Sequence, residues 1–255
     1  MNTRVKTAAE IKAMRASGRM LATVLQALKK QLAVGMTTKD LSVIAASELR
    51  ALGGQPAFLG YQGFPDIICI SVNSEVVHGI PKASKTIQSG DIVSLDFGVV
   101  YDGMITDAAI SVIADKPRDQ RHARLLQATE SSMLEGIATL HDQVRVGDIG
   151  AAVQAVLENP KVGGPYGIVR DLVGHGVGHE IHEDPNIANY GRANTGPWLS
   201  AGMTIAIEPM ATLGTHRVVL APDGWTILTA DGSWAAHFEH SVLITETGAE
   251  ILTQI

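Results

Sequence analysis

Two segments far apart in this chain carry the same order of residues, and this internal repeat limits the fold more than any other feature. In GDIVSLD, Gly90 precedes an apolar run that ends at Asp96, and in GMTIAIE, Gly202 precedes a similar run that ends at Glu208. Two helical patterns come before each segment. The repeat predicts a duplicated α+β unit whose two halves share one central sheet.

Each repeat continues into a turn signal and a second acidic residue. An Asp-Gly pair follows each segment, at Asp102-Gly103 and at Asp223-Gly224, and such pairs are typical of tight turns between strands. Beyond the turns, Asp107 and Glu239 each interrupt a β-prone run. The chain shows no obvious linker between the halves, so we expect a single domain over residues 1–255 with pseudo-twofold symmetry.

Hydrophobic periodicity places the main elements along the chain. It predicts helices over 7–31, 38–52, 119–140 and 147–158, and strands near 67–72, 92–100 and 105–113. Thr7 and Glu10 form a capping-box pattern at the start of the first helix. Thr38 is the expected cap of the second helix, and Gly53-Gly54 is its expected end.

Composition excludes several classes of protein. The chain has 255 residues, 45% of them hydrophobic, and a formal net charge of −6 without a long basic run, which argues against nucleic-acid binding. The sequence contains no run of 18 apolar residues, so we expect no membrane-spanning helix. The first residues also lack the apolar segment of a secretory signal. Cys69 is the single cysteine, so no intrachain disulfide forms. These features predict a cytoplasmic protein.

Four carboxylates stand in apolar, β-prone runs where carboxylates are unexpected: Asp96 in IVSLDFGVV, Asp107 in MITDAAISV, Glu208 in TIAIEPM and Glu239 in AAHFEHSVLI. An unpaired buried carboxylate costs several kcal/mol or becomes protonated. A single case is more often a structural ion pair. Four cases in paired hairpins, with few basic residues nearby, favour neutralisation by divalent cations.

His175 adds a nitrogen ligand to this set. It lies in LVGHGVGHEIHEDP with glycine on both sides, which leaves room for the imidazole and for close approach of the backbone. Four carboxylates and one imidazole favour two ions such as manganese, iron(II), cobalt(II) or zinc over one structural zinc. Paired ions about 3.5–4 Å apart are a known hydrolytic device. HEIHE at 179–183 is not HExxH, and Ser71 and Cys69 lack a nucleophile motif.

Five motifs together resemble the type I methionine aminopeptidases. They are HGIP at 78–81, GDIVSLDFGVVYDGMITDAA at 90–109, GHGVGHEIHEDP at 174–185, GMTIAIEPM at 202–210 and FEHSVLIT at 238–245. The resemblance covers nearly the whole chain in the same order. It implies the pita-bread fold, in which pseudo-twofold α/β units surround a central curved antiparallel sheet. It also implies two divalent metal ions as cofactors. The implied reaction is removal of the initiator methionine from nascent proteins, with a preference for proteins whose second residue is small. We expect a monomer that acts on nascent N-termini, and a place close to the ribosome surface would suit that role.

The resemblance also implies roles for individual residues. Asp96 would chelate one metal, His175 and Glu208 would bind the other, and Asp107 and Glu239 would bridge the pair. Glu208 resembles the residue that shuttles a proton to the leaving amine. His78 and His182 match the histidines that contact the reacting substrate; their alternative interpretation is that of surface histidines on loops.

A cluster of aromatic residues marks the candidate methionine pocket. Phe58, Tyr61 and Phe64 lie within one short segment of a chain that is only 4% aromatic, although plain core packing explains such a cluster equally well. The resemblance adds Cys69 and Trp225 to the pocket. Phe58 and Ile181 differ from the residues common in the family, and His179 has no assigned role.

Two other functions remain open at this stage. A proline-specific pita-bread aminopeptidase or prolidase has the same fold, but those enzymes usually carry an additional N-terminal domain, for which 255 residues leave too little chain. A metal-free pita-bread binding module is the non-enzymatic alternative, and such a module is expected to lose ligands that are all present in this chain.

Overall fold

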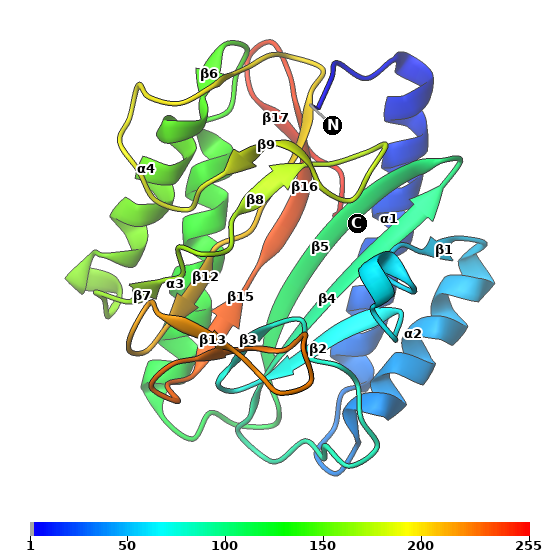
Figure 1. Cartoon of the computed structure of the whole chain (residues 1–255), viewed down its shortest axis with the longest axis vertical. Helices are drawn as coiled ribbons and strands as arrows, with labels where there is room; N and C mark the ends of the chain where they lie inside the picture. The colour runs from blue at the N-terminus through cyan, green and yellow to red at the C-terminus, as the bar shows by residue number, and fades with distance from the viewer. Residues whose placement is uncertain (1–2) are drawn as a thin grey trace.

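The computed structural model describes residues 3–255, and the four predicted helices are all present. They are α1 (Ala8–Gln31), α2 (Thr38–Leu52), α3 (Gln120–Ala138) and α4 (Val146–Leu157). Figure 1 shows α1 and α2 on one side of the strands and α3 and α4 on the other. Two short 3₁₀ helices, η1 (Tyr61–Gly63) and η2 (Pro160–Val162), lie in connecting segments.

Capping residues set the ends of α1 and α2. The hydroxyl of Thr7 accepts from the backbone of Glu10, whose carboxylate accepts from the backbone of Thr7, so the predicted capping box is confirmed. The predicted cap of α2 is wrong by one residue. Thr37 is the N-cap, paired with Asp40, whereas the hydroxyl of Thr38 donates to the carbonyl of Lys82. The helix ends at Gly53, which has a left-handed φ of 81°.

A nine-stranded antiparallel sheet runs through both halves of the molecule. Its main path is β1 (Gln55–Pro56), β4 (Ile92–Tyr101), β5 (Met104–Ile113), β16 (Glu239–Ile244), β11 (Thr204–Ile207), β8 (Gly174–Gly176) and β9 (Glu183–Ile187). In addition, β2 (Ile68–Val72) pairs with β4, and β17 (Ala249–Ile251) pairs with β16. The seam between the two repeats is the β5–β16 pair. Figure 1 shows that β4 and β5 are long and curved.

The two repeats differ in how their central strands are connected. Asp102 and Gly103, both with positive φ, form a two-residue turn between β4 and β5, as expected from the sequence. The second Asp-Gly pair does not join β11 to β16. It lies between β13 (Val218–Leu220) and β14 (Ile227–Thr229), within an excursion over 208–238 that also contains β12 (Met210–Thr212) and β15 (Ala235–His237). Smaller sheets use β3 (Glu75–Val77), β6 (Val144–Arg145), β7 (Gly167–Ile168) and β10 (Trp198–Leu199).

Each repeat has its own hydrophobic core between its helices and its strands. In the first repeat, Leu21 and Leu28 of α1 pack with Leu95 and Phe97 of β4, all fully buried. In the second repeat, side chains of α3 and α4 pack against β11 and β16 in the same manner. Full burial of one such side chain contributes roughly 1.5–3 kcal/mol to the stability of the folded protein. Ile110 of β5 contacts both cores, so the two cores meet at the middle of the shared sheet.

The segment before α1 contacts the second repeat through a buried ion pair. The Nζ of Lys6 lies 2.9 Å from Oε2 of Glu183, the first residue of β9, and both side chains are buried. The backbone of Lys6 also donates to the carbonyl of Gly202. Among residues 3–255, no helix is both long and apolar enough to span a membrane.

Candidate metal centre

Five neighbouring strands each carry one of the predicted metal ligands. Asp96 lies in β4 and Asp107 in β5, Glu239 is the first residue of β16, Glu208 directly follows β11, and His175 is the middle residue of β8. Because β4, β5, β16, β11 and β8 are consecutive in the sheet, the fold brings residues from most of the chain length to one place.

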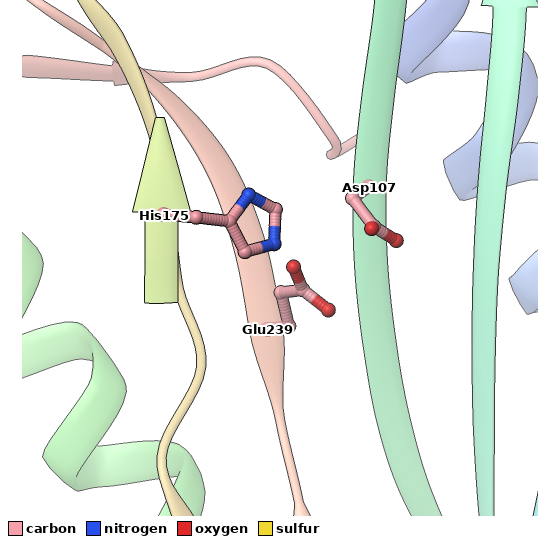
Figure 2. A group of neighbouring side chains, drawn as sticks. All are labelled: Asp107, His175 and Glu239. Atoms are coloured by element: carbon pink, nitrogen blue, oxygen red, sulfur yellow. The ribbon is translucent and has the colours of Figure 1, made fainter. Parts of the chain in front are cut away.

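The ligand atoms of these side chains converge. One ligand atom from each of Asp107, His175 and Glu239 lies within 4.8 Å of the others, and Figure 2 shows the three side chains gathered in one place from three strands. The Nε2 of His175 lies 3.3 Å from Oε1 of Glu208. The Nδ1 of His175 is 2.9 Å from the carbonyl of Gly176, which only accepts hydrogen bonds. Nδ1 therefore carries the proton, and the lone pair on Nε2 faces the carboxylates.

Burial and mutual repulsion disfavour the charged form of these carboxylates in the absence of a cation. Burial, together with neighbouring carboxylates, raises the pKa of Asp96, Asp107 and Glu239 well above the usual range. Each also has one buried oxygen without a hydrogen-bond partner among the described residues. Unpaired acceptors surrounded by negative charge and one imidazole lone pair fit divalent cations.

A single cavity of about 150 Å³ joins the metal ligands to the other predicted site residues. All twelve side chains predicted for the site line it: Phe58, Tyr61, Phe64, Cys69, His78, Asp96, Asp107, His175, His182, Glu208, Trp225 and Glu239. Gln62 and Ile181 complete the wall. The cavity thus has a carboxylate-lined part next to an aromatic part, and the individual roles of these residues stay predictions.

The aromatic part of the cavity is a small packed cluster. Phe64 and Trp225 meet edge to face with ring centroids 5.1 Å apart, and Phe58, Cys69 and Ile181 are buried beside them. Trp225 arrives here through the excursion between β11 and β16, so its place depends on a segment without a counterpart in the first repeat. Such a surface suits an unbranched apolar side chain.

His78 and His182 line the cavity, and both are neutral imidazoles. Burial, followed by the nearby His175 and His78, lowers the pKa of His182 to about 4, and burial lowers the pKa of His78. The ring of His182 lies edge-on to that of His175, with centroids 4.4 Å apart. His78 has a left-handed φ of 59°, a conformation that costs energy in a residue other than glycine and that is found disproportionately at functional sites.

Comparison with known proteins identifies the family. The sequence profile described as metallopeptidase family M24 matches residues 12–246, which is most of the chain. The chain belongs to metallopeptidase family M24. Its converging carboxylates and imidazole therefore have the expected context, and use of divalent metal follows from the family together with the ligand cluster.

Similarity to individual proteins extends over nearly the whole chain. It is 42% identical over 250 residues to methionine aminopeptidase 1 of Bacillus subtilis, with 98% of each chain covered. The crystal structure of methionine aminopeptidase from Thermotoga maritima matches with a TM-score of 0.95 at 44% identity, covering 99% of this chain and all of that one. Prolidase from Pyrococcus furiosus matches with a TM-score of 0.77 at 22% identity, covering 98% of this chain and 65% of that one, which shows a common fold only.

These likenesses decide between the alternatives left open by the sequence. The resemblance to methionine aminopeptidases and the pita-bread architecture, with its antiparallel sheet, are confirmed. The proline-specific enzyme is not favoured, because the likeness to prolidases is restricted to the fold. A metal-free module is not favoured either, because this M24 chain retains a convergent set of ligands.

Sequence reasoning missed one histidine at the metal centre and found no role for another. His237 lies beside Glu208 and Glu239 and forms a second group of potential ligands with them. The only signal was its position two residues before Glu239 in HFEH, since alternate residues of a strand share a face. His179 lies 2.7 Å from Oε1 of Glu10, and its other ring nitrogen faces Glu183.

Proposed function

We propose that this M24 chain hydrolyses the first peptide bond of polypeptides that begin with methionine, with two divalent cations at the convergent ligand set. One observation carries the proposal: five ligand side chains from five adjacent strands meet at the end of an apolar, aromatic cavity. The whole-length likeness to methionine aminopeptidases supports methionine as the released residue.

The ligand set divides naturally between two ions. Asp96 lies at one end, in β4, and would chelate one cation, whereas His175 and Glu208 lie together at the other end and would hold the second. Asp107 and Glu239, from the two central strands, would bridge the pair. Mixed carboxylate and imidazole ligands fit manganese, iron(II), cobalt(II) or zinc.

The side chains around the ligands supply the proton transfers and the hydrogen bonds. The bound cations would polarise the peptide carbonyl and acidify a water molecule. Glu208 accepts the proton of that water and delivers it to the leaving amine. His182, neutral because of its lowered pKa, donates from Nε2 to the carbonyl oxygen as negative charge develops there, and His78 contacts the same part of the substrate.

The cavity explains the preference for N-terminal methionine. Phe58, Tyr61, Phe64, Cys69 and Trp225 form the apolar surface for the thioether side chain, and the carboxylate-lined part of the cavity would hold the cations that receive the free α-amine. By the likeness to methionine aminopeptidases, a small second residue is preferred. We further propose that residues 1–255 act as a single catalytic domain and a monomer, in the cytoplasm, on nascent chains at the ribosome surface.

A metal-replacement assay tests this function. After chelation, the protein is supplied separately with manganese, iron(II), cobalt(II) and zinc, and methionine release from Met-Ala-Ser is measured beside a peptide with proline in second position. We expect activity to return with at least one of the ions and to require the small second residue. Proline-selective cleavage without methionine release would contradict the proposal.

A ligand variant separates metal binding from folding. Asp107→Asn keeps the shape of the side chain and removes a bridging charge. We expect two bound ions in the wild-type protein by elemental analysis, fewer in the variant, and a loss of turnover of at least about a thousandfold, because the ions supply several kcal/mol of transition-state stabilisation. Full activity of a folded variant would refute the ligand assignment.

A further inference from the structure

The register of the central strands shows which residues the two repeats place at equivalent positions. Asp96 of β4 lies opposite Ala109 of β5. In the second repeat, Ile207 lies opposite His240, so continuing β11 by one residue puts Glu208 opposite Glu239. With Asp96 equivalent to Glu208, as the repeat in sequence indicates, Ala109 becomes equivalent to Glu239. The residue equivalent to Asp107 is then His237.

Two serine hydroxyls confirm this equivalence. The Oγ of Ser241 accepts from the backbone N–H of Asp107 and donates to its carbonyl, both at 2.8 Å. The Oγ of Ser111 accepts from the backbone N–H of His237 at 2.9 Å and donates to its carbonyl at 2.8 Å. Each serine thus fixes the backbone of one residue across the β5–β16 seam. The pairing of Asp107 with Glu239 that the sequence repeat indicated is therefore wrong by two residues.

The imidazole of His237 lies directly behind the carboxylates. Its Nε2 is 3.7 Å from Oε2 of Glu208 and 3.9 Å from Oε2 of Glu239. The residue is only 1% exposed, and it is not part of the cavity wall formed by the five predicted ligands. Neither ring nitrogen has a hydrogen-bond partner among the described residues, which is costly for a buried imidazole.

Glu208 is placed between two imidazoles. Its Oε1 faces Nε2 of His175 at 3.3 Å, and its Oε2 faces Nε2 of His237. His237 is buried, and an imidazole carries an N–H on at least one of its two ring nitrogens. A carboxylate only accepts hydrogen bonds, so an N–H at Nε2 is the form that suits Oε2. A movement of about 0.5–1 Å brings the two atoms to hydrogen-bond distance.

We propose that His237 is a positioning residue for Glu208: its Nε2–H binds Oε2 and thereby holds Oε1 beside His175 at the metal. The proposal rests on the proposed function, in which Glu208 is both ligand and proton carrier. The usual arrangement in metal sites is a carboxylate that orients a ligating histidine. Here the order is reversed, and a buried histidine orients a ligating carboxylate.

Three substitutions at this position separate a hydrogen-bond donor from simple packing. His237→Gln places an amide N–H near the position of Nε2, whereas the shorter amide of His237→Asn corresponds to Nδ1 and falls short of Glu208. His237→Leu fills the space without a donor. We expect kcat on Met-Ala-Ser and cobalt(II) affinity to fall about 10–100-fold in the Asn and Leu variants, with KM nearly unchanged, and to be largely restored in the Gln variant.

The experiment uses the full-length protein loaded with cobalt(II), and the visible absorption of the ion reports its coordination independently of turnover. The wild-type spectrum should be kept in the Gln variant and altered in the Asn and Leu variants. Equal behaviour of Gln and Leu would overturn the proposal. So would the same loss of a nitrogen ligand from the spectrum of all three, because His237 would then bind the metal directly. If the Leu variant does not fold, the comparison of Gln with Asn still decides.

Failure of the proposed function gives a different result. A wild-type protein that binds cobalt(II) but releases no methionine would contradict the aminopeptidase activity. The cobalt(II) affinities and spectra of the Gln and Asn variants would still show whether a donor at this position holds Glu208.

Discussion

The phenolic oxygen of Tyr61 lies 2.9 Å from Nδ1 of His182, and this contact fixes how the histidine presents itself to the cavity. The neutral ring has one N–H and one lone pair. When the phenol donates to Nδ1, the proton must be on Nε2, where it would act as the proposed donor toward the substrate carbonyl. The rings of Tyr61 and His182 are also in contact, with centroids 5.5 Å apart.

Removal of the Tyr61 hydroxyl should therefore weaken catalysis more than binding. Tyr61→Phe keeps the aromatic wall but releases Nδ1, and we expect a loss in kcat of about tenfold with little change in KM. His182→Ala removes the donor itself and should cost about 10²–10³ in kcat. Steady-state kinetics on Met-Ala-Ser check both values. An unchanged kcat in Tyr61→Phe would show that the contact does not orient the histidine.

The two serines of the central seam allow a matched pair of stability measurements. Ser241→Ala leaves the buried backbone groups of Asp107 without their partner, and Ser111→Ala does the same for His237. We expect each change to lower the free energy of unfolding by roughly 1–3 kcal/mol in urea titrations of the metal-free protein. Metal affinity should fall more in Ser241→Ala, since Asp107 is the proposed bridging ligand. Equal affinities would indicate that the serines only stabilise the sheet.

Cys69 should be dispensable for the chemistry. Burial, with the negative charge of Asp96 and Asp107 added to it, raises the pKa of the thiol well above its usual range, and the thiol rather than the thiolate is present at neutral pH. We expect Cys69→Ala to keep kcat close to that of the wild-type protein and to raise KM modestly, because a side chain of the proposed methionine pocket is shortened. We expect iodoacetamide to inactivate the wild type slowly. Rapid inactivation that the variant escapes would instead indicate a reactive thiol.

Glu10 provides a test of pH dependence away from the metal centre. Its hydrogen bond with His179, followed by those with Thr7, lowers the pKa of Glu10 to about 2. A carboxyl whose pKa is lower in the folded state stabilises the fold above its unfolded pKa, and that contribution is lost as pH falls toward the folded value.

Glu10→Gln retains the capping pattern of α1 but removes the charge that His179 contacts. At pH values above 5, we expect the variant to melt at a lower temperature than the wild type, by at most about 3 °C. The difference is small because the Glu10–His179 pair is partly exposed. The difference should shrink as pH is lowered from about 4.5 toward 2. A difference that grows with acidity would have the wrong sign. Thermal unfolding over this pH range provides the measurement.

Local patterns were sufficient to predict the helices, the β4–β5 hairpin and the acidic positions. The capping box of Thr7 and Glu10 and the Asp102-Gly103 turn involve residues close in sequence, so their chemistry is visible before folding. The cap of α2 was misplaced because Thr37 and Thr38 are adjacent and equally suitable by type. The choice depends on Asp40, which completes the capping box with Thr37.

Features that depend on distant contacts could not be predicted in the same way. The excursion over 208–238 delivers Trp225 to the cavity through short strands that carry little periodicity of their own. His179 meets Glu10 only because the start of α1 lies beside the segment between β8 and β9. His237 gains its relation to Glu208 only from the register of β5, β16 and β11. These relationships are set by the three-dimensional pairing of strands, which leaves no local trace.

The placement of the ligands across the β5–β16 seam has a consequence for the integrity of the protein. Asp96 and Asp107 come from one repeat, and His175, Glu208 and Glu239 come from the other, so neither repeat holds a complete set. Separation of the repeats requires release of any ion bound to both, and occupancy therefore adds to the free energy of unfolding by mass action. We therefore expect a chelator to lower both the activity and the resistance to proteolysis, because one bound pair of ions would support both.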